Sequence, residues 1–180
     1  MIAAARELLG QGVTPTVEQA AERAGISRAT AYRYFVNQQL LLSAVHPETE
    51  AVSLLPPDAP PGPVERAAVV AEEILRIILE NEAELRAMLR ISLIPRVVDQ
   101  ALPLRQGRRL MWFEDALSPA RPALGTRRYR RLVLAVAAAV GVESFIWLTD
   151  MAGLPRRQAA HLLVDIARAL TRDALAQVES

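Results

Sequence analysis

The sequence predicts an all-α fold, and three observations support that prediction. Apolar residues make up 52 % of the 180 residues but aromatic residues only 4 %, so the core must be aliphatic. Helix-favouring residues, chiefly Ala, Leu, Glu and Arg, are abundant, whereas strand-favouring residues are scarce. Apolar side chains also recur at helical spacing along most of the chain. A chain of this length can form one large domain or two small ones.

The chain opens with signals for short helices. A helix over residues 2–9 is followed by glycines that end it. Thr16 is a suitable N-cap for the next helix, with Gln19 three residues later as its capping-box partner. Gly25 permits the positive φ of a sharp turn after this second helix. The spacing therefore predicts two helices joined to a third by a tight turn.

The third and fourth helices follow directly. Ser27 caps a helix over residues 28–35, and Asn37 caps another that runs to His46. The first 46 residues are therefore predicted to form one small domain, in which the first three helices make a helix-turn-helix unit. His46 lies next to Pro47 and is interpreted as a packing residue at the domain boundary.

A proline-rich stretch comes next. Residues 47–63 hold six of the twelve prolines, which predicts a linker. The remainder, residues 64–180, is predicted to form a larger helical domain. Its helices are expected at residues 64–81, 82–94, 108–117 and 126–149, with a last helix that starts at Pro155.

Composition and motif content argue against several classes of protein. There is no cysteine, which excludes disulfides and thiolate metal sites. The two histidines, His46 and His161, are far apart, and no phosphate loop, nucleophile motif or metal-ligand spacing is present. We therefore expect neither an enzyme nor a bound metal or cofactor. The net charge of +1 means that any surface for nucleic acid must be local.

The most apolar stretch does not predict a membrane span. Residues 132–148 are 17 in number and include Glu143. A spanning helix needs about 20 apolar residues, so a buried or subunit-facing helix is the better interpretation. No targeting segment is recognised either, and a cytoplasmic protein without membrane contact is expected.

The helix over residues 28–35 has the side chains that a DNA-reading helix needs. Ala31 and Phe35 are spaced to face the core. The side chains expected to project outward are Arg28, Thr30, Arg33 and Tyr34, with Tyr32 at the edge. Arginine can clamp guanine through two hydrogen bonds in the major groove. This helix therefore favours DNA binding over an ordinary solvated face.

The run TVEQAAERAGISRATAYRYFVNQQLLL, from Thr16 to Leu42, resembles the DNA-binding domain of the TetR family of transcriptional regulators. The shared features are an Ala-rich helix, the AGIS turn, a threonine in the next helix and the Y-R-Y-F ending. The resemblance covers residues 2–46, and the rest is similar only in architecture. It implies a dimeric, ligand-responsive regulator, expected to be a repressor, that binds an inverted-repeat operator in double-stranded DNA.

Residue roles follow from the chemistry and from the resemblance together. Arg28, Thr30 and Arg33 are the candidates for reading base edges. The hydroxyls of Ser27, Tyr32 and Tyr34 suit phosphate oxygens, and Thr14 and Thr16 lie at a helix start that would form a second phosphate clamp.

The candidate domain departs from the family in its charge. Gln38 stands where the family usually has a lysine aimed at a phosphate, so it brings a hydrogen bond without charge. Residues 1–46 carry four arginines against three acidic residues, which predicts weak electrostatic attraction to DNA.

The last two helices are predicted to pair two copies of the chain. Their apolar residues exceed what one hairpin can plausibly bury, although an intramolecular core is the alternative. The residues assigned to this interface are Leu132, Val136, Val140, Phe145, Leu162, Leu163, Ile166 and Leu170.

A small molecule is a candidate effector, held by the helices after the linker. The candidate contacts are Arg86, Arg90, Trp112, Phe113 and Glu143. Each has a structural alternative. The arginines can form a solvated stripe or pair with Glu82, and the aromatic residues can be part of the core. Glu143 can pair with an arginine. The effector would shift the population of conformers through the helix over residues 37–46.

The sequence also fits a second interpretation of the function of the whole chain. Gln38 and the low charge of the first 46 residues fit a helical small-molecule-binding or protein-interaction module with weak or lost DNA binding. Substitution of Arg28 and Tyr32 would separate the two interpretations, because only a DNA reader would lose operator affinity.

Overall fold

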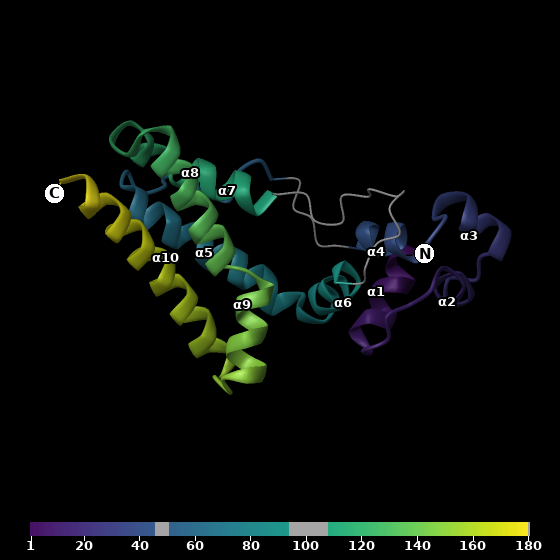
Figure 1. Cartoon of the computed structure of the whole chain (residues 1–180). Coiled ribbons are helices and arrows are strands. Elements are labelled where there is room, and N and C mark those ends of the chain that lie inside the picture. Colours follow the sequence, from purple (N-terminus) through teal and green to yellow (C-terminus); the bar gives the residue numbers. More distant parts are fainter. Residues whose placement is uncertain (46–50, 94–107, 180) are drawn as a thin grey trace. The chain divides into compact units, whose positions relative to one another are not determined.

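The computed structural model describes residues 1–45, 51–93 and 108–179, which divide into two compact units (Figure 1). Unit 1 holds helices α1 to α4 and α6, and unit 2 holds α5 and α7 to α10. Over the described ranges the regular structure is helical and contains no strand, as the sequence predicts. The boundary role expected of His46 lies outside the described residues.

Unit 1 has a small aliphatic core. Its helices are α1 (Ile2–Gly10), α2 (Val17–Arg23), α3 (Arg28–Tyr34), α4 (Gln38–Val45) and α6 (Glu82–Ser92). Ala5, Ala20 and Ala31 are fully buried, so the helices approach closely. Ala87 of α6 belongs to the same core, because α6 packs on α1 and α4. The structure thus groups α6 with the first domain, whereas the sequence-based division placed it with the second.

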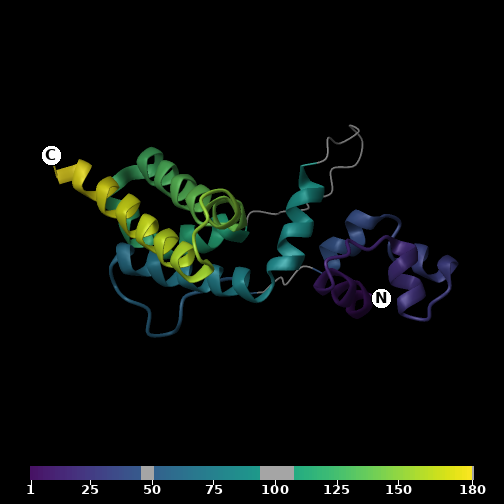
Figure 2. The ribbon, with the colours of Figure 1, turned by 90° about the horizontal axis from the view of Figure 1, so that it is seen from below.

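Unit 2 is a bundle of longer helices. Its elements are α5 (Pro63–Glu80), α7 (Arg108–Ala116), the 3₁₀ turn η1 (Ser118–Ala120), α8 (Arg121–Ala139), α9 (Val142–Ile146), the π-helical turn η2 (Trp147–Met151) and α10 (Arg156–Glu179). α10 packs along α5 and α8, and α7 contacts the same two helices (Figure 2). Phe113, Phe145 and Leu163 fill the core between them.

The prediction of one helix over residues 126–149 is wrong. α8 ends at Ala139, and Val140 and Gly141 are extended before α9 begins. A side chain at Gly141 would collide with the Arg109 guanidinium, since an ideal Cβ there would lie 1.6 Å from Nη1. Gly125, with φ 66° and ψ 168°, also interrupts α8 near its start. The extended backbone at Val140 and Gly141 therefore separates two helices where the sequence predicted one.

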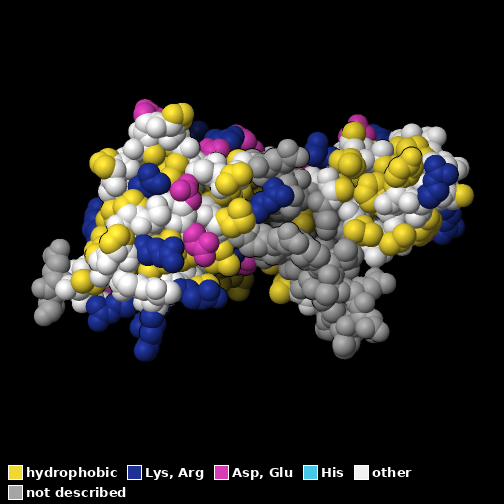
Figure 3. Space-filling view, turned by 90° about the horizontal axis from the view of Figure 1, so that it is seen from above, with side chains coloured by type: hydrophobic (Ala, Val, Ile, Leu, Met, Phe, Trp, Pro, Cys, Tyr) yellow, Lys and Arg dark blue, Asp and Glu magenta, His cyan; other side chains and the backbone are white. Residues whose placement is uncertain are grey.

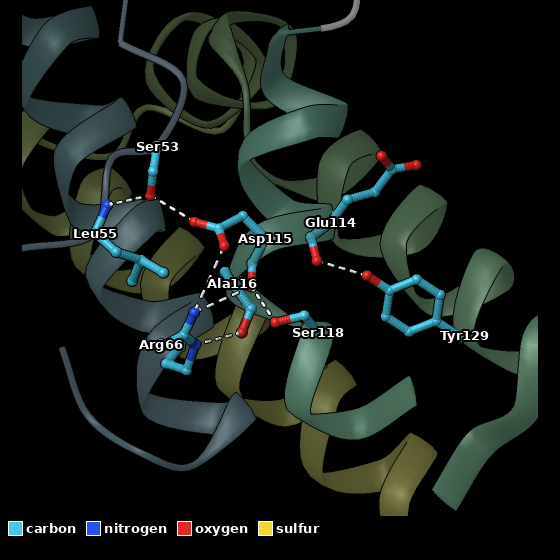
Figure 4. A network of polar contacts seen from close by, with 8 residues as sticks. All are labelled: Ser53, Leu55, Arg66, Glu114, Asp115, Ala116, Ser118 and Tyr129. Atoms are coloured by element: carbon cyan, nitrogen blue, oxygen red, sulfur yellow. Dashed lines mark hydrogen bonds and ion pairs between the residues drawn. The ribbon is translucent and has the colours of Figure 1, made fainter. Parts of the chain in front are cut away.

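The described part of the predicted linker is attached to unit 2. The Ser53 hydroxyl donates to the Asp115 carboxylate of α7 over 2.5 Å and accepts from the Leu55 N–H over 3.1 Å (Figure 4). The Trp112 indole N–H donates to the carbonyl of Ala51 over 2.9 Å. The irregular residues 51–62 are therefore held against α7 at their beginning.

Most side chains assigned to the dimer interface lie in the core of their own subunit. Leu132, Val136, Val140, Phe145 and Leu163 are all buried in unit 2. This supports the intramolecular alternative for these five, because a buried side chain has no surface left for a partner. The other three are on α10: Leu162 is 38 % exposed, and Ile166 and Leu170 are partly exposed.

One observation concerns membranes. Within the described ranges no single helix is both long and apolar enough to cross a bilayer, and only the bent pair Ser118–Ala139 and Val142–Met151 meets the length and composition requirements together.

Candidate nucleic-acid interface

A helix–turn–helix arrangement of α2 and α3 forms the centre of unit 1. α2 begins at a complete capping box, in which the Thr16 hydroxyl accepts from the Gln19 N–H and the Gln19 side chain accepts from the Thr16 N–H. Gly25, two residues after its end, has a φ of 65°, and the Ile26 N–H closes the turn on the carbonyl of Ala21 over 2.9 Å. Local hydrogen bonds therefore fix both ends of α2 and the direction in which α3 leaves.

α3 presents one face to the core and the other to solvent. The Ser27 hydroxyl caps it by accepting from the Thr30 N–H over 3.2 Å, and the two hydroxyls lie 2.8 Å apart. Ala31 is fully buried and orients the helix. The exposed side chains are Arg28, Tyr32, Arg33 and Tyr34, with Thr30 partly exposed, which is the set that the helical spacing predicts.

The end of α3 carries a cation beside an exposed ring. The Arg33 guanidinium carbon lies 5.8 Å from the ring centroid of Tyr34, a cation–π distance, and Tyr34 is 67 % exposed. Over the described ranges Arg33 forms no ion pair. Basic side chains are visible on the face of unit 1 that Figure 3 shows. The Arg33 charge is therefore available to an anionic partner.

Gln38 is engaged by the chain itself. Its side-chain N–H₂ donates to the carbonyl of Pro15 over 2.9 Å, with a longer contact of 3.5 Å to that of Thr14. This ties the start of α4 to the loop that precedes α2. Thr14 is partly exposed and Thr16 is exposed in that loop. The structure thus gives Gln38 a positioning contact in the free protein.

Glu18 is a residue of this surface that sequence reasoning missed. Arg28 Nη2 donates to its Oε1 over 2.6 Å, and the Tyr32 hydroxyl donates to the same oxygen. These contacts lower the pKa of Glu18 to about 2; the Tyr32 hydrogen bond is the largest cause, followed by the backbone N–H of Glu18 and by Arg28. An acidic residue in the first turn of α2 is ordinary in a sequence, and only the crossing of α2 and α3 brings it to Arg28.

The other arginines of residues 1–45 also contact their own chain. Arg23 pairs with Glu7 over 2.8 Å, and Arg6 donates to the carbonyl of Val45 over 3.3 Å. With Arg28 on Glu18, three of the four arginines in this range are engaged. The electrostatic weakness predicted from composition is therefore accompanied by internal pairing.

Residues 1–45 match the sequence model of the family described as bacterial regulatory proteins, tetR family. The matched range comprises α1 to α4 and contains the whole helix-turn-helix arrangement. These residues form a TetR-family DNA-binding domain. The resemblance in the sequence is thereby confirmed for residues 1–45, and their helix-turn-helix arrangement is that of a DNA-binding regulator. Comparisons with curated proteins and with solved structures gave no significant match.

The candidate ligand contacts are divided between the two units. Arg86 and Arg90 are on α6 of unit 1, where Arg86 pairs with Glu82 over 2.7 Å and Arg90 is exposed. The other three, Trp112, Phe113 and Glu143, are in unit 2. Two of the five candidates therefore lie in unit 1 and three in unit 2.

Within unit 2 the three candidates have different surroundings. Phe113 is fully buried in the core, so the structural alternative holds for it. Trp112 is only partly buried, with its indole N–H bonded to Ala51. Glu143 is partly exposed and forms an ion pair with Arg109 over 3.0 Å. Across the described residues no group of three or more His, Cys, Asp or Glu side chains is placed to hold a metal ion.

Proposed function

We propose that this TetR-family protein acts as a dimeric repressor that binds an inverted-repeat operator through α3. The observation that carries this proposal is the exposed face of α3, which is capped at its start by Ser27 and carries Arg28, Arg33 and Thr30. A helix of this kind reads base edges in the major groove with a few side chains near its start. Arginine can donate two hydrogen bonds to guanine, and threonine can bind either base or phosphate.

Phosphate contacts are proposed for the hydroxyl groups around α3. Tyr34 is highly exposed, and Thr14 and Thr16 lie in the loop before α2. The Ser27 hydroxyl caps α3 and is hydrogen-bonded to the Thr30 hydroxyl. Ser27 therefore contributes mainly by fixing the start of the helix. Such contacts set the register of the protein on the duplex without reading sequence.

Selection of duplexes from a random pool with the full-length protein tests this function. We expect an enriched inverted repeat whose half-sites lie about one helical turn apart, near 34–36 Å, or somewhat more. Arg33→Ala should weaken binding to the selected site by about ten-fold or more, since one specific arginine–guanine contact contributes about 1–3 kcal/mol. Arg76→Ala is the matched control, because Arg76 is an exposed arginine of α5 that pairs only with Glu73 and Glu80 among the contacts described. If no duplex is enriched at low salt, the proposed function is wrong.

Dimerisation is proposed to use the exposed face of α10 and its neighbour α8. Leu162 on α10 and Leu134 on α8 are 38 % and 46 % exposed, and the two helices pack against each other. Trp147 and Met151 in η2 are also exposed, at 60 % and 76 %. Apolar and basic side chains are interspersed on the face of unit 2 that Figure 3 shows. A second copy that covers these residues would supply the second reading helix of an inverted repeat.

Control by a small molecule is proposed for unit 2. Trp112 offers a partly buried aromatic surface, and the Arg109–Glu143 pair offers charge of both signs. An effector regulates DNA binding only if it binds the DNA-bound and free conformers with different affinity, and the coupling is reciprocal. A compound that raises the unfolding temperature of the protein should therefore also change operator affinity, and operator DNA should change the affinity for that compound by the same factor.

A further inference from the structure

Glu18 belongs to α2, but its carboxylate is bonded to two side chains of α3. Arg28 Nη2 lies 2.6 Å from Oε1, and the Tyr32 hydroxyl donates to the same oxygen. The Arg28 side chain is 73 % exposed and that of Glu18 is 34 % exposed, so DNA could reach this pair. Because Arg28 and Tyr32 matter here only if α3 faces DNA, the inference rests on the proposed function.

Arg28 can bind DNA through attraction to phosphates or through hydrogen bonds to a base. The pair with Glu18 weakens the first of these more than the second. The carboxylate cancels the charge of the guanidinium, and attraction to the phosphate backbone depends on that charge. It occupies only one of the five N–H donors of the guanidinium. Other donors remain to bind O6 and N7 of a guanine. A paired Arg28 therefore loses more of its affinity for phosphate than of its capacity to recognise a base.

The same distinction holds for Tyr32. Its hydroxyl has one proton, and that proton is donated to Glu18. Phosphate oxygens only accept hydrogen bonds, so a paired Tyr32 has no proton to offer them. The amino groups of cytosine and adenine are donors in the major groove, and the lone pairs of the hydroxyl can still accept from them. Tyr32 was expected to bind phosphate, and the contact with Glu18 opposes that role.

Because residues 1–45 have few positive charges that are not paired, the carboxylate of Glu18 has a large effect on their attraction to DNA. Of the four arginines in residues 1–45, Arg23 pairs with Glu7 and Arg6 is bonded to a main-chain carbonyl. Arg33 is left as the arginine of α3 whose charge is not cancelled over the described ranges. If Arg28 were released from Glu18, the uncancelled positive charge on α3 would double.

We propose that Glu18 is a specificity-determining residue, which withholds Arg28 and Tyr32 from DNA phosphates while leaving both able to bind base edges. Binding to unrelated DNA is mainly electrostatic, so it is suppressed. Binding to the operator retains the base contacts. The protein thereby gains discrimination by reducing its affinity for the wrong sequence.

The test compares full-length Glu18→Gln with full-length Glu7→Gln. Both substitutions remove one negative charge from unit 1, an exposed one at Glu7 and a partly exposed one at Glu18, and both break one arginine pair. The Glu7 pair is with Arg23 on α2 and involves no residue of α3. Each protein is titrated with the duplex that the wild type selects from a random pool and with a scrambled duplex of equal length. The titrations are repeated over a series of salt concentrations.

Glu18→Gln should raise affinity for the scrambled duplex about two- to five-fold, the range of one exposed ion pair. Its salt dependence should steepen by about 0.9 in the slope of log K against log salt, as expected for one more phosphate contact. Affinity for the selected duplex should change less, so the specificity ratio falls. In an Arg28→Ala, Tyr32→Phe background the substitution at Glu18 should have no more effect than Glu7→Gln.

Other results would overturn the proposal in distinguishable ways. If Glu18→Gln and Glu7→Gln give the same changes on both duplexes, the effect is one of general charge and Glu18 has no specific role. If Glu18→Gln weakens only the selected duplex, Glu18 aims Arg28 at its base and does not withhold it. If both affinities fall together with the unfolding temperature, in Glu18→Gln and in Glu18→Ala, the residue is structural. If the wild type selects no duplex, it is the proposed function that fails.

Discussion

The guanidinium of Arg66, on α5, donates to the main-chain carbonyl of Ala116, the last residue of α7, over 3.0 Å. It also donates to the carbonyl of Asp115 over 3.2 Å, and the Tyr129 hydroxyl of α8 donates to that of Glu114 over 2.5 Å (Figure 4). The last carbonyls of a helix have no partner within the helix. Two neighbouring helices therefore complete the end of α7, which in turn holds residues 51–55.

Arg66→Met should destabilise unit 2. Methionine keeps much of the length of the side chain but cannot donate, so the partly buried carbonyl of Ala116 loses its donor and that of Asp115 keeps only the Ser118 hydroxyl, 2.8 Å away. We expect the free energy of unfolding to fall by about 1–3 kcal/mol, measured by chemical denaturation. Arg76→Met is the control on the same helix, because the Arg76 pairs are exposed and should contribute under about 1 kcal/mol. Equal losses in the two variants would contradict the role of Arg66.

Gly25→Ala should destabilise unit 1 through the backbone alone. Gly25 has a φ of 65°, and a Cβ added there meets no atom within 4 Å, so the cost is conformational and not steric. The expected loss is about 1–2 kcal/mol in the free energy of unfolding. Gly10→Ala is a matched control in the last turn of α1, where space is also free and φ is not positive. It should be neutral or stabilising, since alanine favours helix. A loss at residue 10 as large as that at residue 25 would argue against a backbone cause.

The Glu18 cluster should be insensitive to pH over the physiological range. The pKa of Glu18 is lowered from 4.5 to about 2, so its contribution to stability is complete above pH 4.5 and is lost as the pH falls through about 2. The titration of the Glu18 carboxyl by NMR in the free protein measures this directly. Tyr32→Phe removes the largest cause of the shift and should move the midpoint back towards 4.5. A wild-type midpoint near 4.5 would mean that the contacts with Tyr32 and Arg28 do not persist in solution.

Local signals explain why so much of unit 1 could be predicted. The Thr16–Gln19 capping box, the turn at Gly25 and the Ser27 cap are each formed within a few residues, and the structure has all three. The contact of Glu18 with Arg28 joins residues ten apart on different helices, so the sequence carried no local signal for it. Pattern predicts which face of α3 is exposed but not which exposed groups pair with each other.

The errors in unit 2 have a similar origin. Glycine within an apolar run is tolerated by many helices, so Gly141 alone does not predict that α8 ends at Ala139 and that Val140 and Gly141 are extended. Apolar periodicity also indicates that a side chain is buried, but not whether its own subunit or a second copy of the chain buries it. Val136 and Phe145 are buried by their own subunit, whereas Leu162 two turns into α10 is not, and the sequence pattern was the same for all three.

Leu162→Arg should separate the proposed dimer while leaving the subunit folded. Leu162 is 38 % exposed on α10, so the new charge can remain in solvent in the monomer but would be buried against a second copy. We expect the variant to sediment near the 19.7 kDa of one chain at micromolar concentration. Its affinity for the selected inverted repeat should fall by about 100-fold or more, because the second half-site is no longer held at high effective concentration. Leu79→Arg is the control, since Leu79 is 39 % exposed on α5, outside the proposed interface. A wild type that sediments as a monomer, or a Leu79→Arg variant that dissociates equally, would show that α10 does not pair the subunits.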